Sequence, residues 1–68
     1  MLKPGNRVGV ICNRYNRPDR EASQTLIGEI INVVEDGLNR TYTLRIDFHN
    51  GWLITSTDDE SLLFPTFH

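Results

Sequence analysis

The chain has 68 residues, 38% of them hydrophobic, and a formal net charge of −2. A chain of this length suits one domain with a small core, because it buries only about 60% of the surface that its unfolded form exposes. One cysteine excludes an internal disulfide framework, and neither a long apolar run nor the apolar part of a signal peptide is present. We therefore expect residues 1–68 to form a single domain of a cytoplasmic protein that has no membrane contact.

The charges are unevenly distributed along the chain. Residues 1–20 contain five basic side chains and one acidic one, whereas residues 21–68 contain two basic and eight acidic ones. A basic first third can steer an anionic partner to one side of a protein. Ordinary surface charge explains the same pattern, and the sequence leaves both interpretations open.

The first predicted element is a strand over residues 7–12. Pro4 and Gly5 before it are typical of a turn. Within the strand, Gly9 indicates a bend or the close approach of another backbone. Alternate positions share one face, and they are Val8, Val10 and Cys12. Cys12 is most simply a small hydrophobic residue of the core.

Residues 13–25 form the longest stretch without a strand pattern. They contain three arginines and one tyrosine but no large aliphatic residue. Loops this long in a small domain are often binding loops, and Tyr and Arg are favoured in binding hot spots. The candidate binding residues are Arg14, Tyr15, Arg17 and Arg20. The alternative is a solvated loop whose tyrosine packs on the rim of the fold.

A strand is predicted over residues 26–34. A helix over Pro18–Val34 also fits the apolar spacing, but the run is rich in β-branched residues. Gly28 in the middle of a helix would cost about 1 kcal/mol relative to alanine. Both faces of the strand carry aliphatic side chains. Either the strand bends so that its facing changes midway, or an exposed stripe containing Ile30 and Val34 meets a partner or a second copy.

The clearest pattern is the strict alternation of Thr41–Phe48. Asn50-Gly51 follows it, which predicts a hairpin with a type I′ turn because both central residues of that turn need positive φ. A strand over 52–56, opened by Trp52, completes a three-stranded meander. One face of the alternating strand is apolar, and its residues are Tyr42, Leu44, Ile46 and Phe48.

The last predicted elements are one helical turn and a closing strand. Thr57 and Glu60 have capping-box spacing. The closing strand covers 62–64, Pro65 ends it, and residues 66–68 form a tail that we expect to fray.

No pattern of catalytic or metal-binding residues is visible. His49, His68 and Cys12 lack the spacing of a zinc site, and the acidic run 58–60 lacks the spacing of a calcium loop. Phosphate-binding loops and nucleophile motifs are also missing. We therefore expect a protein that is not an enzyme and that binds neither a metal nor a cofactor.

The order of five strands, with a long first loop and a helical turn before the last strand, resembles the SH3-like small barrels. Lys3-Pro4-Gly5-x-Arg7-Val8, followed by Gly28-Glu29-Ile30, resembles the start of several such families. They include KOW- and Tudor-type nucleic-acid-binding modules, photosynthetic subunits that dock ferredoxin, and plasmid-borne type II dihydrofolate reductases. The resemblance implies an all-β, five-stranded SH3-like barrel.

The same resemblance bears on function. The reductases carry Val-Gln-Ile-Tyr on the fourth strand, where this chain reads Trp52-Leu53-Ile54-Thr55-Ser56, so their catalytic surface is absent. The resemblance also implies that Trp52 lies near the long first loop and joins its arginines and tyrosine in one patch. Alternatively, Trp52 is a packing residue of the core or rim.

We expect a small, non-catalytic protein-interaction or regulatory module. It would act through the basic-aromatic loop and an exposed apolar strand, with another protein or a second copy as partner. The alternative is a nucleic-acid-binding module in which the loop arginines contact phosphates while Tyr15 or Trp52 stacks on bases. The sequence pI of about 5.5 favours the first function.

Overall fold

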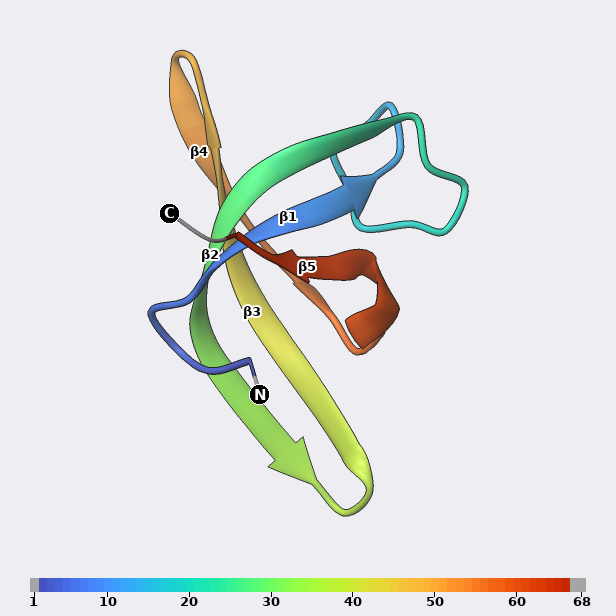
Figure 1. Ribbon diagram of the computed structural model, residues 1–68, viewed down its shortest axis with the longest axis vertical. Helices are drawn as coiled ribbons and strands as arrows, with labels where there is room; N and C mark the ends of the chain where they lie inside the picture. Colours follow the sequence, from blue (N-terminus) through green and yellow to red (C-terminus); the bar gives the residue numbers. More distant parts are fainter. Residues whose placement is uncertain (1, 67–68) are drawn as a thin grey trace.

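The computed structural model describes residues 2–66 and shows a single antiparallel sheet of five strands (Figure 1). Neighbours across the sheet follow the order β4-β3-β2-β1-β5. One turn of 3-10 helix, η1 (Glu60–Leu62), precedes the last strand. The strands are β1 (Arg7–Cys12), β2 (Gln24–Asp36), β3 (Asn39–Phe48), β4 (Gly51–Thr57) and β5 (Leu63–Pro65).

These elements confirm the all-β prediction, and the alternative helix over Pro18–Val34 does not form. β4 and β5 are the two edges of the sheet, and no backbone pairing between them is found in residues 2–66. The same residues contain no helix that is both long and apolar enough to cross a membrane.

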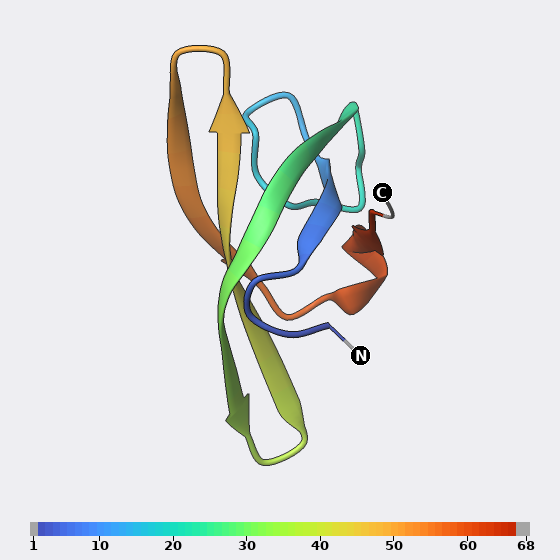
Figure 2. The same ribbon diagram turned by 60° about the vertical axis from the view of Figure 1, so that its left-hand side comes forward.

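The long strand β2 curves through the middle of the molecule (Figures 1 and 2). Its first part pairs with β1, and its second part extends beyond β1 alongside β3. Opposite β3, Ile30 pairs with Leu44 but Asn32 pairs with Thr43, so one extra residue forms a β-bulge. The bulge is the place where the side chains of β2 change their facing.

This bulge corrects the prediction of an exposed stripe on β2. Ile30 is completely buried in the core, so it does not form a surface for a partner or a second copy. Val34 is 49% exposed, Ile31 in the bulge is exposed too, and Val33 is half-buried against the core. The apolar run is therefore divided between core and surface, as a bent strand requires.

Most of the core comes from side chains of β1, β2 and β3. The alternation of β3 is confirmed, because Tyr42, Leu44 and Ile46 are buried and Phe48 is half-buried. Cys12 is fully buried, and burial raises the pKa of its thiol, which confirms its role as a core residue. The other buried hydrophobic residues are Leu2, Val8, Val10, Ile30, Leu62 and Leu63.

Gly28 pairs with β1 on one side and with β3 on the other. A Cβ atom there would be 2.9 Å from the carbonyl oxygen of Arg45, whereas a Cβ atom on Gly9 would make contacts of 3.4 Å or more. The close backbone approach anticipated at Gly9 is therefore found at Gly28, on the neighbouring strand.

Positive-φ glycines occupy the turn before β1 and the turn between β2 and β3. The predicted turn over Lys3–Asn6 forms, with Gly5 at φ +93° and the Asn6 N–H donating to the Lys3 carbonyl at 3.1 Å. Between β2 and β3, Gly37 has φ +61° at the first turn position, which is the pattern of a type II′ turn.

The predicted Asn50-Gly51 type I′ turn is wrong. Phe48 pairs with Gly51, so the turn residues are His49 and Asn50, and neither has a positive φ. The alternation of inward-facing side chains in β3 continues to Phe48. Because Gly51 pairs with Phe48, Gly51 is the first residue of β4.

The cap of η1 also differs from the prediction. Asp59, not Thr57, is the N-cap, and its side chain accepts the backbone N–H of Ser61 at 3.1 Å. Thr57 instead uses its hydroxyl oxygen to accept the N–H of Asp59 at 3.1 Å. Of the predicted tail, Phe67 and His68 lie outside the described residues.

Candidate functional site in the loop between β1 and β2

Asn13 organises the start of the loop between β1 and β2, residues 13–23. Its side-chain oxygen accepts the backbone N–H of Tyr15 at 2.8 Å and that of Arg17 at 3.2 Å. Its own N–H donates to the Arg17 carbonyl at 2.9 Å, and its carbonyl accepts the N–H of Asn16 at 3.0 Å. Asn16 has φ +65°, a conformation that asparagine tolerates better than most residues. Residues 13–17 therefore form a tight, closed turn.

A second group of hydrogen bonds fastens the loop to the sheet. The N–H groups of Asp19 and Ser23 donate to the carbonyls of Ile11 and Cys12, at 3.2 and 3.0 Å. Gln24, at the start of β2, donates through Nε2 to the Asn13 carbonyl at 3.1 Å. It also donates to Oδ1 of Asn16 at 2.6 Å. These bonds fix both ends of the loop to β1 and β2, while most residues of the loop remain exposed to solvent.

This bracing displays a small basic-aromatic surface. The guanidinium carbon of Arg14 lies 4.9 Å from the centre of the Tyr15 ring, within cation–π distance. Nη2 of Arg14 also donates to the Tyr15 hydroxyl at 2.8 Å. Tyr15 is 65% exposed, and Arg14 and Arg17 are exposed as well. We call these three residues, Arg14, Tyr15 and Arg17, the loop patch.

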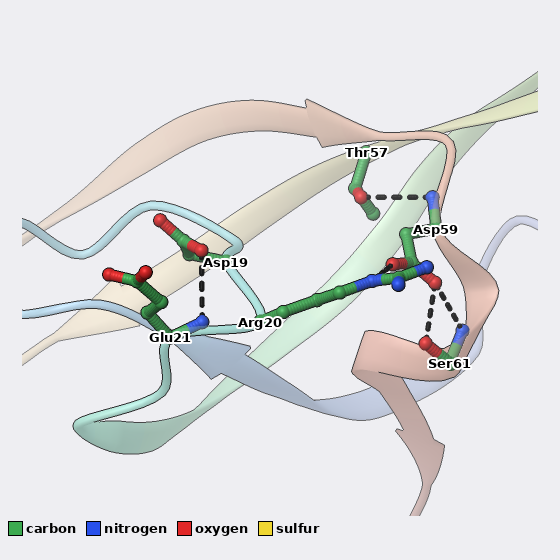
Figure 3. Close-up of polar contacts among 6 residues, drawn as sticks. All are labelled: Asp19, Arg20, Glu21, Thr57, Asp59 and Ser61. Carbon is green, nitrogen blue, oxygen red and sulfur yellow. Dashed lines mark hydrogen bonds and ion pairs between the residues drawn. The ribbon is translucent and has the colours of Figure 1, made fainter.

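Arg20 has a different role from the other loop arginines. It reaches across to η1, where its Nε donates to Oδ2 of Asp59 at 2.6 Å (Figure 3). The other oxygen of Asp59 accepts the N–H and hydroxyl of Ser61, at 3.1 and 2.5 Å. The bonds from Ser61 and Arg20 lower the pKa of Asp59, because they favour its charged form. Arg20 thus ties the loop to η1.

Asp19 supports the loop in a similar way. It accepts the N–H of Glu21 at 3.0 Å and the side-chain amide of Asn13 at 3.2 Å. These two bonds lower the pKa of Asp19. Next to the loop patch, an open cleft of about 410 Å³ is lined by Asn13, Arg14, Tyr15, Asp19, Glu21 and Ser23. Both signs of charge therefore line the cleft.

Trp52 does not join the loop patch. It is the second residue of β4, pairs with Asp47 and is 66% exposed, so it is not a core residue either. The tip of the β3–β4 hairpin, next to which Trp52 lies, stands apart from the β1–β2 loop in Figure 1. The single patch implied by the SH3-like resemblance is therefore not assembled.

The sequence interpretation missed the residues that hold the loop. The side chains of Asn13 and Asp19 accept hydrogen bonds from the backbone N–H groups two residues ahead. Asn and Asp often make such bonds in loops, so their positions at the start and middle of this loop could have indicated this role. The partnership of Arg20 with Asp59 joins residues 39 positions apart, and no local pattern indicates it.

Within residues 2–66, no group of three or more His, Cys, Asp or Glu side chains is arranged to hold a metal ion. His68, considered with His49 and Cys12, lies outside that range. No protein-family model, curated protein or solved structure significantly matches this chain.

Proposed function

We propose that this chain is a small, non-catalytic interaction module of the cytoplasm that binds an acidic segment of a protein partner through the loop patch. We further propose that its sheet belongs to the SH3-like class. The strand order, the long first loop and the 3-10 turn before β5 support that class. The loop patch supplies the cationic and aromatic groups that recognise the partner.

The observation that carries this proposal is the bracing of residues 13–17. Asn13 closes the turn, so the backbone that carries Arg14, Tyr15 and Arg17 is held in place before any partner arrives. A surface that is already ordered loses less conformational entropy on binding. Neither Arg14 nor Arg17 has a carboxylate within ion-pair distance in residues 2–66, so both are available to an acidic partner.

Charge favours a protein over a nucleic acid as the partner. Arg20 is already paired with Asp59, which leaves only two arginines in the loop patch, and Asp19 and Glu21 lie beside them. The whole chain carries a net charge of −2. Nucleic-acid binding draws most of its affinity from many phosphate contacts. An arginine stacked on an exposed tyrosine can still act as a base-stacking platform, which keeps single-stranded nucleic acid as the alternative.

The test compares two double variants with the same change in net charge. Arg14→Ser with Arg17→Ser removes the charge of the loop patch. Lys3→Ser with Arg7→Ser removes two exposed charges elsewhere that make no ion pair in residues 2–66. Immobilised wild type and both variants are used to capture proteins from the source cell, with and without nuclease, and binding of the captured protein is then measured by calorimetry.

The proposal expects nuclease-resistant capture of a protein by the wild type and by the Lys3/Arg7 variant. Loss of both patch arginines should weaken binding roughly 30- to 150-fold, at about 1–1.5 kcal/mol for each charged contact. Equal binding by the two double variants would contradict the proposal. Capture that disappears with nuclease, together with an affinity that falls steeply with salt, would establish the nucleic-acid alternative instead.

A further inference from the structure

β4 is an edge strand without the usual protection. Among residues 2–66 it pairs with β3 only, and its seven residues contain no charged residue, no proline and no register shift. Natural proteins use these features to stop edge strands from pairing with other chains. The opposite edge, β5, is three residues long and ends at Pro65. Of the two edges of the sheet, β4 is therefore the one suited to accept another strand.

Hydrogen-bonded and non-hydrogen-bonded residue pairs alternate along the β3–β4 hairpin, and this alternation shows which backbone groups of β4 face outward. Phe48 and Gly51 close a two-residue turn, and such a closing pair exchanges both of its hydrogen bonds. Alternation along the ladder then turns the backbone groups of Leu53 and Thr55 toward β3. The N–H and C=O groups of Trp52, Ile54 and Ser56 point away from the sheet.

Hydrogen bonds between β2 and the N-terminal turn independently indicate which residues of β4 face β3. Ile30 bonds to the N-terminal turn, because its N–H donates to Asn6 at 2.9 Å and its carbonyl accepts from Gly5 at 2.8 Å. Ile30 lies opposite Leu44, so Leu44 is left to bond to its partner on β4, which is Thr55. Thr55 therefore faces β3 and Ile54 faces outward.

The side chains along this edge are apolar and exposed. Trp52 is 66% and Ile54 is 45% exposed, and both lie on the outer face of the sheet. Leu53, on the inner face, is 36% exposed. Large apolar side chains gathered on a surface commonly mark an interaction site.

We propose that β4 pairs in antiparallel fashion with β4 of a second copy of this chain, with Ile54 on the two-fold axis. In this register Ile54 faces Ile54 of the partner copy, and Trp52 faces Ser56. Each of the three outward residues then belongs to a pair that exchanges two hydrogen bonds, so no outward N–H or C=O between Trp52 and Ser56 is left unpaired. A shift by two residues would leave at least one of these residues without a partner.

Charge and symmetry argue for a second copy as the occupant. β4 has no charge that would repel its own duplicate, and the same register places Asp58 opposite Asn50, not opposite another carboxylate. Trp52 of one copy lies diagonal to Ile54 of the other, within reach for an aromatic side chain. Two-fold pairing lets one surface serve both subunits. The proposed β4–β4 contact does not involve the loop patch, so the dimer proposal and the proposed function can fail independently of each other.

The test uses one variant and a charge-matched control. Ile54→Lys places two like charges on the axis, while Asn32→Lys adds the same charge to an exposed position of β2. Sedimentation equilibrium gives the mass at high micromolar concentration, and circular dichroism checks that each variant is folded. Backbone amide exchange of the wild type is followed at low and high protein concentration.

We expect wild type and Asn32→Lys to reach twice the 7.8 kDa mass of one chain, and Ile54→Lys to dimerise at least about tenfold more weakly. The amides of Trp52, Ile54 and Ser56 should become protected as concentration rises, whereas those of Leu53 and Thr55 should be protected throughout. A monomeric wild type would overturn the proposal. So would a dimer that Ile54→Lys leaves intact, or amides of Trp52, Ile54 and Ser56 whose exchange does not depend on concentration.

Discussion

Single residues decide where the backbone of this small sheet can come close together. Gly28 faces Val8 on one side and Ile46 on the other, at the point where β2 passes between β1 and β3. The carbonyl of Arg45 occupies the space in which a side chain would begin. Because that neighbour is backbone within a paired strand, it has little freedom to move.

We predict that Gly28→Ala lowers the free energy of unfolding by about 1–3 kcal/mol, the usual cost of overpacking a core. Gly51→Ala is the matched control, because a Cβ atom on Gly51 meets nothing within 4 Å and its φ is not positive. The control should stay within about 0.5 kcal/mol of wild type. Urea denaturation measures both variants, and equal stabilities would show that the sheet relaxes around Gly28.

At this scale the sequence predicted burial better than it predicted contacts between distant residues. Alternation identified the buried side chains of β1 and β3, because period two is a local property of a strand. It did not distinguish Gly28 from Gly9, or Arg14, which has no ion pair in residues 2–66, from Arg20, which pairs with Asp59. Those differences depend on which residues of other elements lie opposite them.

Among the elements, the loop and η1 stabilise each other. Arg20 bonds to Asp59, and Asp59 is also the N-cap of η1, so one carboxylate holds two segments that are far apart in the sequence (Figure 3). Its contacts with Ser61 and Arg20 lower the pKa of Asp59 in the folded chain. A lowered folded-state pKa means that the charged carboxylate contributes to stability.

The sign of this linkage predicts a pH dependence. The contribution is fully present above the unfolded pKa, about 3.9 for aspartate, and is lost as the pH falls through the lower folded-state pKa. Asp59→Asn should therefore lower Tm at neutral pH, and its difference from wild type should shrink as the solution becomes more acidic. Thermal scans between neutral and strongly acidic pH measure this difference.

Asp58→Asn is the control for that prediction. Asp58 is exposed and makes no side-chain hydrogen bond or ion pair in residues 2–66, so its replacement should leave Tm close to that of wild type at every pH. A gap between Asp59→Asn and wild type that persists unchanged into strong acid would mean that the carboxylate charge does not hold the loop.

The sequence predicted the five strands and the helical turn, but it did not predict all of their boundaries. The strands of the meander and the turn before β5 were expected, because they depend on local patterning. The Asn50-Gly51 turn was misplaced, because the pairing of Phe48 with Gly51 outweighed the local turn preference. Asp59 replaced Thr57 as the cap of η1, since the 3-10 helix starts later than the capping-box spacing indicated.

For the molecule as a whole, β2 joins two parts of the sheet. The first part of β2 pairs with β1. After the bulge, the second part of β2 pairs with β3 as far as the turn between β2 and β3 (Figures 1 and 2). The sequence indicated a bend through the aliphatic residues on both faces of β2, but it could not locate the bulge. It also could not show that Trp52 lies away from the loop, because that depends on the course of the β3–β4 hairpin.

The function proposed for this protein depends most on the loop being ordered before a partner binds. Backbone ¹⁵N relaxation of the free chain tests this directly. We predict order parameters of about 0.8 or more for Asn13–Arg17, close to those of the paired strands, because Asn13 and Gln24 brace that turn. Values below about 0.6 for these residues, with rigid values in β1 and β2, would show a flexible loop and contradict a preformed site.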